Sequence, residues 1–240
     1  AGTDVCEVHN FELVEVDNDR HVMLVGSDLH LANKQNDLNF FSNGFLAETQ
    51  AFADSSPLPV YCLIAGDMTW DRYWYDNDFA IADYKRLLSS SGYTVPVFHT
   101  MGNHDNDPYV TGDVLGQTPY CNTLGPNYYS FNLGRVHYVV LDDIDWINTG
   151  GAEGVVGDRN FNALVSLAQM EWLACRRGQD GSAGHLPPCA ASWELQLLVH
   201  QRSPHVQHDG RYGRPVEGRR RLLRRTLHHG PHALQQHDGH

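Results

Sequence analysis

Three short runs of apolar residues, each followed at once by polar side chains, stand out in the first hundred residues of the chain. They cover residues 21–26, 60–65 and 95–101, and their length and boundaries are typical of buried β-strands. The segments between them, residues 37–53 and 76–89, are predicted to be helices. Strands that alternate with helices favour parallel pairing through βαβ units. The pattern therefore predicts an α/β fold around a mixed sheet.

The first predicted helix, over residues 37–53, has a candidate N-terminal cap and an apolar face. Asp37 is a residue type that caps helices, and it precedes the apolar positions. The side chains expected to face the sheet are Leu38, Phe41, Phe45, Leu46 and Phe52.

Beyond residue 105 the pattern is less regular. Residues 106–126 are rich in Gly, Pro, Asn and Asp and are predicted to form a long loop, of the kind that is usually functional or disordered. Residues 128–133 and 135–141 are predicted to pair as a hairpin, and residues 162–172 to form a helix. An edge strand is also predicted near the start of the chain, over residues 11–16.

Composition limits the class of protein without fixing its function. The chain has 240 residues, enough for one large domain with a substantial core. No apolar run reaches the roughly 18 residues of a membrane span, so none is predicted. The five cysteines are odd in number and scattered, which fits neither a disulfide framework nor a cysteine-ligated zinc site. The chain begins at Ala1 rather than Met, as an exported protein would after removal of its signal, but the sequence does not determine the compartment.

Side chains able to bind a metal follow each of the three predicted strands. The ends of parallel strands meet at one edge of a sheet, where open α/β folds bind their ligands. Carboxylate, imidazole and amide groups together suit a borderline divalent ion such as Zn, Mn or Fe. A pair of such ions roughly 3.5–4 Å apart can clamp the attacking and leaving oxygens of a displacement at phosphorus. The candidate residues are Asp28, His30, Asp67, Asn103, His104 and Asp105.

Each of these motifs is weak by itself. An isolated Asp at the end of a strand is as often a helix cap or a turn former as a ligand. The order Asp-x-His, Gly-Asp and Gly-Asn-His-Asp, each after an apolar strand, is far more specific. Within it, Asp67 could bridge two ions through its two oxygens, and Asp105 could orient His104 or raise its pKa.

The three motifs together resemble those of the calcineurin-like metallophosphoesterases, over about residues 20–174. The resemblance implies an α/β sandwich, a dinuclear centre of divalent ions and hydrolysis of a phosphate ester. It implies that Asp28 and His30 bind the first metal, that Asp67 bridges and that Asn103 binds the second. It further implies that His104 binds no metal, and that it protonates the leaving group or steadies the phosphoryl oxygens, so that Asn103 and His104 contact substrate.

The resemblance ends near residue 174, which divides the chain into a core over 1–174 and a tail over 175–240. The family pattern requires a strand ending in His and then Gly-His-x-His, and neither follows here. The tail has ten Arg and nine of the fifteen His but no Phe, Ile, Met, Asn or Lys, and no buried strand is readable in it. We therefore expect this part of the fold to be incomplete or irregular, and the C-terminal metal ligands to be missing.

An out-of-frame translation would explain the tail. Read one base later in each codon, residues 184–189 can encode V-I-C-L-H-A, which is a strand ending in His. Residues 206–210 can encode F-N-T-T-D, and residues 227–234 can encode F-T-T-V-H-M-L-S. On this hypothesis the frame changes between residues 174 and 178, and the histidines of the tail are not ligands. Those histidines include His200, His228, His229 and His240.

The sequence favours a metal-dependent phosphoesterase acting on a small-molecule or macromolecular phosphate ester, with reduced activity in the chain as printed. One alternative is a non-catalytic relative that binds a phosphorylated ligand through the same cleft. Another is a nucleic-acid binder that uses the arginine run of residues 219–225, which we favour less. The identity of the metal, the substrate and the oligomeric state do not follow from the sequence.

Overall fold

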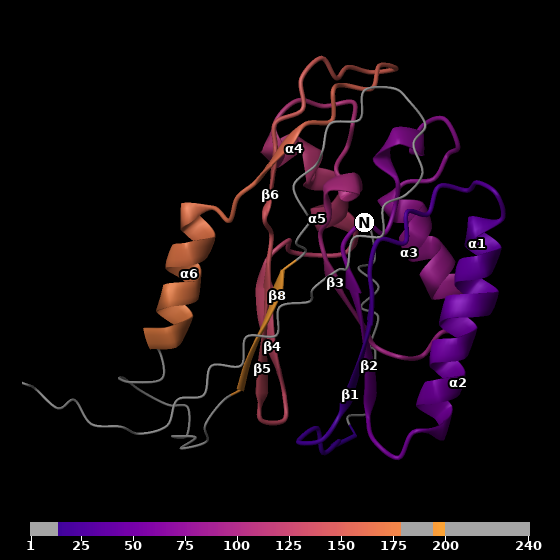
Figure 1. Cartoon of the computed structure of the whole chain (residues 1–240), viewed down its shortest axis with the longest axis vertical. Helices are drawn as coiled ribbons and strands as arrows, with labels where there is room; N and C mark the ends of the chain where they lie inside the picture. The colour runs from indigo at the N-terminus through magenta and orange to yellow at the C-terminus, as the bar shows by residue number, and fades with distance from the viewer. Residues whose placement is uncertain (1–13, 179–193, 200–240) are drawn as a thin grey trace, which may run out of the picture.

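The computed structural model describes residues 14–178 and 194–199 and arranges them in layers (Figure 1). Two three-stranded sheets form the centre, and helices lie outside them. Helices α2 and α3 flank the first sheet, whereas α6 lies on the opposite side of the molecule, beside the second sheet (Figure 1). The α/β sandwich expected from the sequence is therefore confirmed.

The first sheet consists of the three strands that the apolar runs predicted. They are β1 (Val22–Gly26), β2 (Val60–Ala65) and β3 (Val97–Thr100), in the order β1-β2-β3. Both pairings are parallel. All three strands therefore end at the same edge of the sheet, so the polar residues that follow them are brought together.

The predicted helix over 37–53 is present as one continuous helical segment. It comprises α1 (Asp37–Phe40), a π-helical turn η1 (Phe41–Leu46) and α2 (Ala47–Ser55). Of the expected apolar side chains, Phe41 and Leu46 are buried and Leu38 and Phe45 pack against the core, but Phe52 is 47% exposed. The predicted cap is wrong, because Asn36 is the N-cap and Asp37 is the first residue of the helix. The Asp37 carboxylate instead stabilises the preceding loop, where it accepts hydrogen bonds from the backbone N–H groups of Ala32 and Lys34.

The second predicted helix begins later than expected. A 3-10 turn, η2 (Asp71–Tyr73), follows β2, and α3 (Ile81–Ser90) starts five residues after the predicted position 76. The Trp74 side chain explains the delay, because its buried indole Nε1 donates to the hydroxyl of Thr69 and so holds this segment against the end of β2.

The second sheet contains β4 (Tyr129–Leu133), β5 (Val136–Leu141) and β8 (Glu194–Val199), in the order β4-β5-β8. The hairpin between β4 and β5 confirms the prediction. Strand β8 pairs in parallel with β5 and was not predicted, since the sequence showed no readable buried strand after residue 174.

Aromatic side chains join the two sheets. Phe98 of β3 stacks on Phe131 of β4 with ring centroids 3.8 Å apart, and Phe131 stacks in turn on Tyr138 of β5 at 5.0 Å. The Tyr129 hydroxyl donates to the backbone carbonyl of His99 and accepts from its N–H. Stacked rings of this kind contribute beyond the area that they bury.

Several predictions for the second half of the chain need correction. The expected loop 106–126 contains α4 (Asp113–Gly116) and α5 (Thr118–Thr123), because Tyr120 inserts into the core. Residues 161–163, partly assigned to a helix, form β7 (Phe161–Ala163) and pair with β6 (Ile144–Trp146). The helix itself, α6 (Leu167–Gly178), begins later and runs further than predicted.

The predicted edge strand near the start of the chain is wrong where it can be assessed. Residues 14–16 do not form a strand, and residues 11–13 lie outside the described residues. Among the helices of the described ranges, none has both the length and the hydropathy that crossing a bilayer requires.

Asp142, which follows β5, gives the protein a testable dependence of stability on pH. Burial raises the pKa of this carboxyl to about 6, despite hydrogen bonds from Ile144 and Asn127. The folded state therefore keeps the proton between about pH 4 and pH 6, where the unfolded state loses it. The contribution of Asp142 to stability is complete below pH 4 and is lost as the pH rises to 6.

We expect the free energy of unfolding of the wild type, relative to Asp142→Asn, to fall by up to about 3 kcal/mol over this interval. Urea titrations of both proteins at pH 4, 5, 6 and 7 measure the difference. A difference that is constant across the four values would contradict the raised pKa.

Candidate active site

The candidate residues lie in three loops at the edge where β1, β2 and β3 end. Asp28, His30 and Asp67 all have left-handed backbone conformations, with φ of 54°, 49° and 53°. Such conformations are uncommon for residues other than glycine and cost of order 1–3 kcal/mol each. The loops are held together by backbone hydrogen bonds, including His30 N–H to the Asp67 carbonyl at 2.9 Å. Strain concentrated at one edge of a sheet is typical of functional sites.

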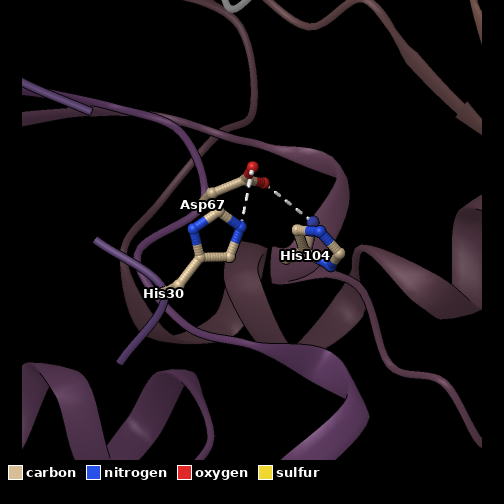
Figure 2. Close-up of side chains that lie close together, drawn as sticks. All are labelled: His30, Asp67 and His104. Atoms are coloured by element: carbon tan, nitrogen blue, oxygen red, sulfur yellow. Dashed lines mark hydrogen bonds and ion pairs between the residues drawn. The ribbon is translucent and has the colours of Figure 1, made fainter. Parts of the chain in front are cut away.

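His30, Asp67 and His104 point toward one another (Figure 2). Among the residues that the structure describes, they form the group of His, Cys, Asp or Glu side chains whose ligand atoms all lie within 4.8 Å of each other. The Nε2 atom of His30 is 3.5 Å from Oδ2 of Asp67, and Oδ1 of Asp67 accepts the backbone N–H of His104 at 2.9 Å. Burial lowers the pKa of His30, which favours the neutral imidazole that binds metals.

Glycine at position 102 is required by the close approach of two loops. A Cβ atom there would lie 2.3 Å from the backbone N of Asp67 and 2.4 Å from its Oδ1. Any larger residue would therefore push the Asp67 loop away from the turn η3 (Asn103–Asp105). The glycine of the Gly-Asn-His-Asp motif allows the carboxylate of Asp67 to reach the backbone of His104.

Asn103 presents a buried oxygen at this edge. The residue is 3% exposed, and its Oδ1 has no hydrogen-bond partner among the described residues. A buried polar atom without a partner costs about 1–3 kcal/mol unless a ligand or water satisfies it. The amide oxygen is therefore suited to bind a cation or a polar substrate atom.

Asp28 lies outside the compact group of three. Its backbone N–H donates to the Gly66 carbonyl at 3.1 Å, and its own carbonyl lies 3.2 Å from Nδ1 of His30. Its charge nevertheless acts on His30, whose pKa it raises slightly against the larger effect of burial. The structure therefore places Asp28 next to the group without making it a member.

The structure gives Asp105 a different environment from the one expected. Its two carboxylate oxygens accept the backbone N–H groups of Gly102 at 2.9 Å and Thr69 at 3.1 Å. Burial and the nearby Asp67 raise the pKa of Asp105 well above its ordinary value. Asp105 thus joins the loops after β2 and β3, and a different carboxylate contacts the ring of His104.

That carboxylate belongs to Asp71, in η2. Its Oδ1 lies 2.7 Å from Nδ1 of His104, and the residue is 1% exposed. The sequence suggested that Asp71 either contacts a ligand or faces solvent, and its burial shows that the second is wrong. Burial alone would raise its pKa, but hydrogen bonds from His104 and Arg159 outweigh burial and lower it, so Asp71 is an ionised acceptor.

Arg159 is the second partner of Asp71 and was missed by sequence reasoning. Its Nε donates to Oδ2 at 2.5 Å and its Nη2 to Oδ1 at 2.6 Å. The same Nη2 lies 3.0 Å from Nδ1 of His104. The available signal was weak: Arg159 is the single Lys or Arg between residues 136 and 175, in a glycine-rich segment with no recognisable motif.

One of the aromatic residues that follow Asp67 borders the candidate site. The ring of Trp70 is 5.5 Å from that of His30 and 6.3 Å from that of His104, in edge contacts. Trp74 instead packs inside the protein. Of these two tryptophans, one therefore packs in the core and the other lies beside the candidate ligands.

The donor set fits a divalent metal. It combines a neutral imidazole, a buried carboxylate and a buried amide oxygen without a hydrogen-bond partner, and borderline ions such as Zn, Mn and Fe accept all three.

Two features of the tail lie outside the described residues. They are the arginine run of residues 219–225 and the histidines His200, His228, His229 and His240.

Comparison with known proteins agrees with this geometry. The model of the calcineurin-like phosphoesterase family matches residues 22–194. The curated protein "serine/threonine-protein phosphatase CPPED1" from Pongo abelii and from Homo sapiens is 28% identical to this chain over 96 residues. The match covers 39% of this chain and only 29% of each relative, so the chain spans less than a third of the length of these proteins.

Proposed function

Because the chain belongs to the calcineurin-like phosphoesterase family, we propose that it is a metal-dependent hydrolase of phosphate esters with a dinuclear centre. The observation that carries the proposal is the convergence of donors at the ends of three parallel strands. The ligand atoms of His30, Asp67 and His104 lie within 4.8 Å of one another. Asn103, whose buried Oδ1 has no hydrogen-bond partner among the described residues, comes after the third of those strands. Together with the family match, this arrangement supports hydrolysis of a phosphoester.

In this proposal the ligands of two divalent ions, Mn, Fe or Zn, come from the three strand ends. Asp28 and His30 would hold the first ion, Asp67 would bridge, and Asn103 would hold the second. The ions would supply Lewis-acid stabilisation of the phosphoryl oxygens and an activated water. The position of Asp28 beside the compact group fits a ligand that completes the first site.

In this proposal His104, with Asp71 and Arg159 beside it, is the group that transfers protons. Because Asp71 and Arg159 lie at Nδ1 of His104, we assign its chemistry to Nε2. From there it would protonate the leaving oxygen or hydrogen-bond to the phosphoryl oxygens. Asp105, a catalytic candidate from the sequence, would act by holding Gly102 and Thr69, the residues that position the loops.

The substrate is proposed as a phosphate ester, small or macromolecular. The name of the curated relatives favours a phosphoprotein, over the 39% of this chain that matches them. The family pattern also predicts C-terminal histidine ligands, which the printed sequence does not provide after residue 174. We therefore expect weak binding of the first metal, weaker binding of the second, and low turnover.

Metal content and turnover test the proposal together. We expect p-nitrophenyl phosphate hydrolysis that rises with added Mn²⁺ and is lost in Asn103→Ala, with fewer than two ions retained per chain. A protein that only binds phosphorylated ligands would show no turnover above that variant and would contradict the hydrolase assignment. A full complement of two ions with high turnover would contradict the loss of C-terminal ligands.

A further inference from the structure

Arg159 reaches the candidate active site from a loop that is distant in the sequence. It lies 88 positions after Asp71, and its guanidinium makes two hydrogen bonds to both oxygens of that buried carboxylate. Such a bidentate ion pair fixes the orientation of the carboxylate and also places a positive charge beside it. Because Asp71 also accepts from His104, the guanidinium, the carboxylate and the imidazole are fixed relative to one another.

The loop over residues 147–160 is built to present this side chain. Strands β6 and β7 pair at its two ends and close it. Within it, Thr149 donates two hydrogen bonds to the Asp158 carboxylate, and the Asp158 N–H donates to the Thr149 carbonyl. Arg159 itself has φ of 59°, an uncommon left-handed conformation for a long side chain.

A buried asparagine ties this loop to the segment that follows His104. Asn148 is fully buried, and its Nδ2 donates to the carbonyls of Pro108 and Val110. Its Oδ1 accepts the Arg159 N–H at 2.6 Å. A Cβ at Gly157 would lie 2.2 Å from that oxygen, so the close packing requires glycine. The backbone of Arg159 is thus fixed to the chain segment that carries the site.

We propose that Arg159 is a positioning residue, which clamps Asp71 so that the ring of His104 keeps one orientation toward the substrate. This inference rests on the proposed function and adds to it a residue from outside the family motifs. Nη2 of Arg159 and Oδ1 of Asp71 both lie within hydrogen-bond distance of the same ring nitrogen. Rotation of the imidazole would break contacts with both. Removing the guanidinium leaves the Asp71 carboxylate without its clamp, so that the carboxylate and the ring bonded to it can change orientation.

The test compares Arg159→Ala and Arg159→Lys with the wild type in Mn²⁺-dependent turnover of p-nitrophenyl phosphate. We expect kcat to fall about 10- to 100-fold in Arg159→Ala with little change in KM, since misplacing a catalytic group acts on the chemical step. Arg159→Lys should recover part of the loss, and added guanidinium should partly rescue the alanine variant. Arg135→Ala is the matched control, because Arg135 pairs with Asp19 on the surface.

A second readout does not depend on turnover. In a long-range ¹H–¹⁵N spectrum, the His104 ring should show one tautomer in the wild type and in Arg159→Lys, and a mixture in Arg159→Ala. An unchanged tautomer would overturn the proposal, as would a raised KM with unchanged kcat, which would make Arg159 a substrate ligand. Wild-type protein without metal-dependent turnover would instead overturn the proposed function, and the spectrum would still decide the role of Arg159.

Discussion

Replacing Asp67 by asparagine is expected to reduce Mn²⁺-dependent phosphatase turnover about 10³-fold or to below detection. Asp67 is fully buried, lies 3.5 Å from His30 Nε2 and accepts the His104 N–H. Asparagine keeps the size of the side chain but removes the charge that two cations would share. Loss of several kcal/mol of Lewis-acid stabilisation corresponds to about three powers of ten in rate. Turnover of 4-methylumbelliferyl phosphate at saturating Mn²⁺, and calorimetric titration with Mn²⁺, measure the two effects.

The control for this substitution is Asp76→Asn. It makes the same chemical change at an exposed carboxylate, whose ion pair with Arg72 is at the surface. We expect that variant to keep the turnover and Mn²⁺ affinity of the wild type. If Asp67→Asn also kept a third or more of the turnover, with unchanged affinity, the centre would not lie at this edge of the sheet.

The first half of the fold could be predicted because its strands are continuous apolar runs, and the central strand, β2, is buried on both faces. Continuous apolar runs such as residues 60–65 mark such strands plainly, and β2 has the predicted bounds. Parallel pairing then brings the residues after each strand to one edge, which is why His30, Asp67 and His104 were correctly expected to lie near one another. Strand β8 was missed because its surroundings in the sequence carry no such pattern.

The partners of His104 could not be predicted in the same way. Adjacency in the sequence suggested Asp105, but a residue one position along a tight turn points elsewhere, and in η3 its oxygens bond backbone N–H groups. Asp71 and Arg159 reach the imidazole through folding of separate segments. Long-range side-chain pairs of this kind follow no periodic pattern in the sequence. A single sequence therefore indicates candidate metal ligands more readily than the residues that would position them.

Replacing His104 by asparagine is expected to affect substrates with different leaving groups unequally. A positioned acid contributes typically 10²–10⁴-fold, and its contribution grows with the basicity of the oxygen that it protonates. We therefore expect kcat/KM to fall about 10³-fold for an alkyl ester such as glycerol phosphate, but only about tenfold for p-nitrophenyl phosphate, whose leaving group departs without a proton.

The ratio of the two losses decides between the roles left open for His104. A histidine that only steadies the phosphoryl oxygens would cost both substrates equally, because those oxygens are the same in each. A histidine held by Asp71 at Nδ1 is instead arranged to deliver a proton from Nε2, and only the alkyl ester needs that proton. Equal losses would therefore contradict protonation of the leaving group, but they would not bear on the proposed metal binding by His30 and Asp67.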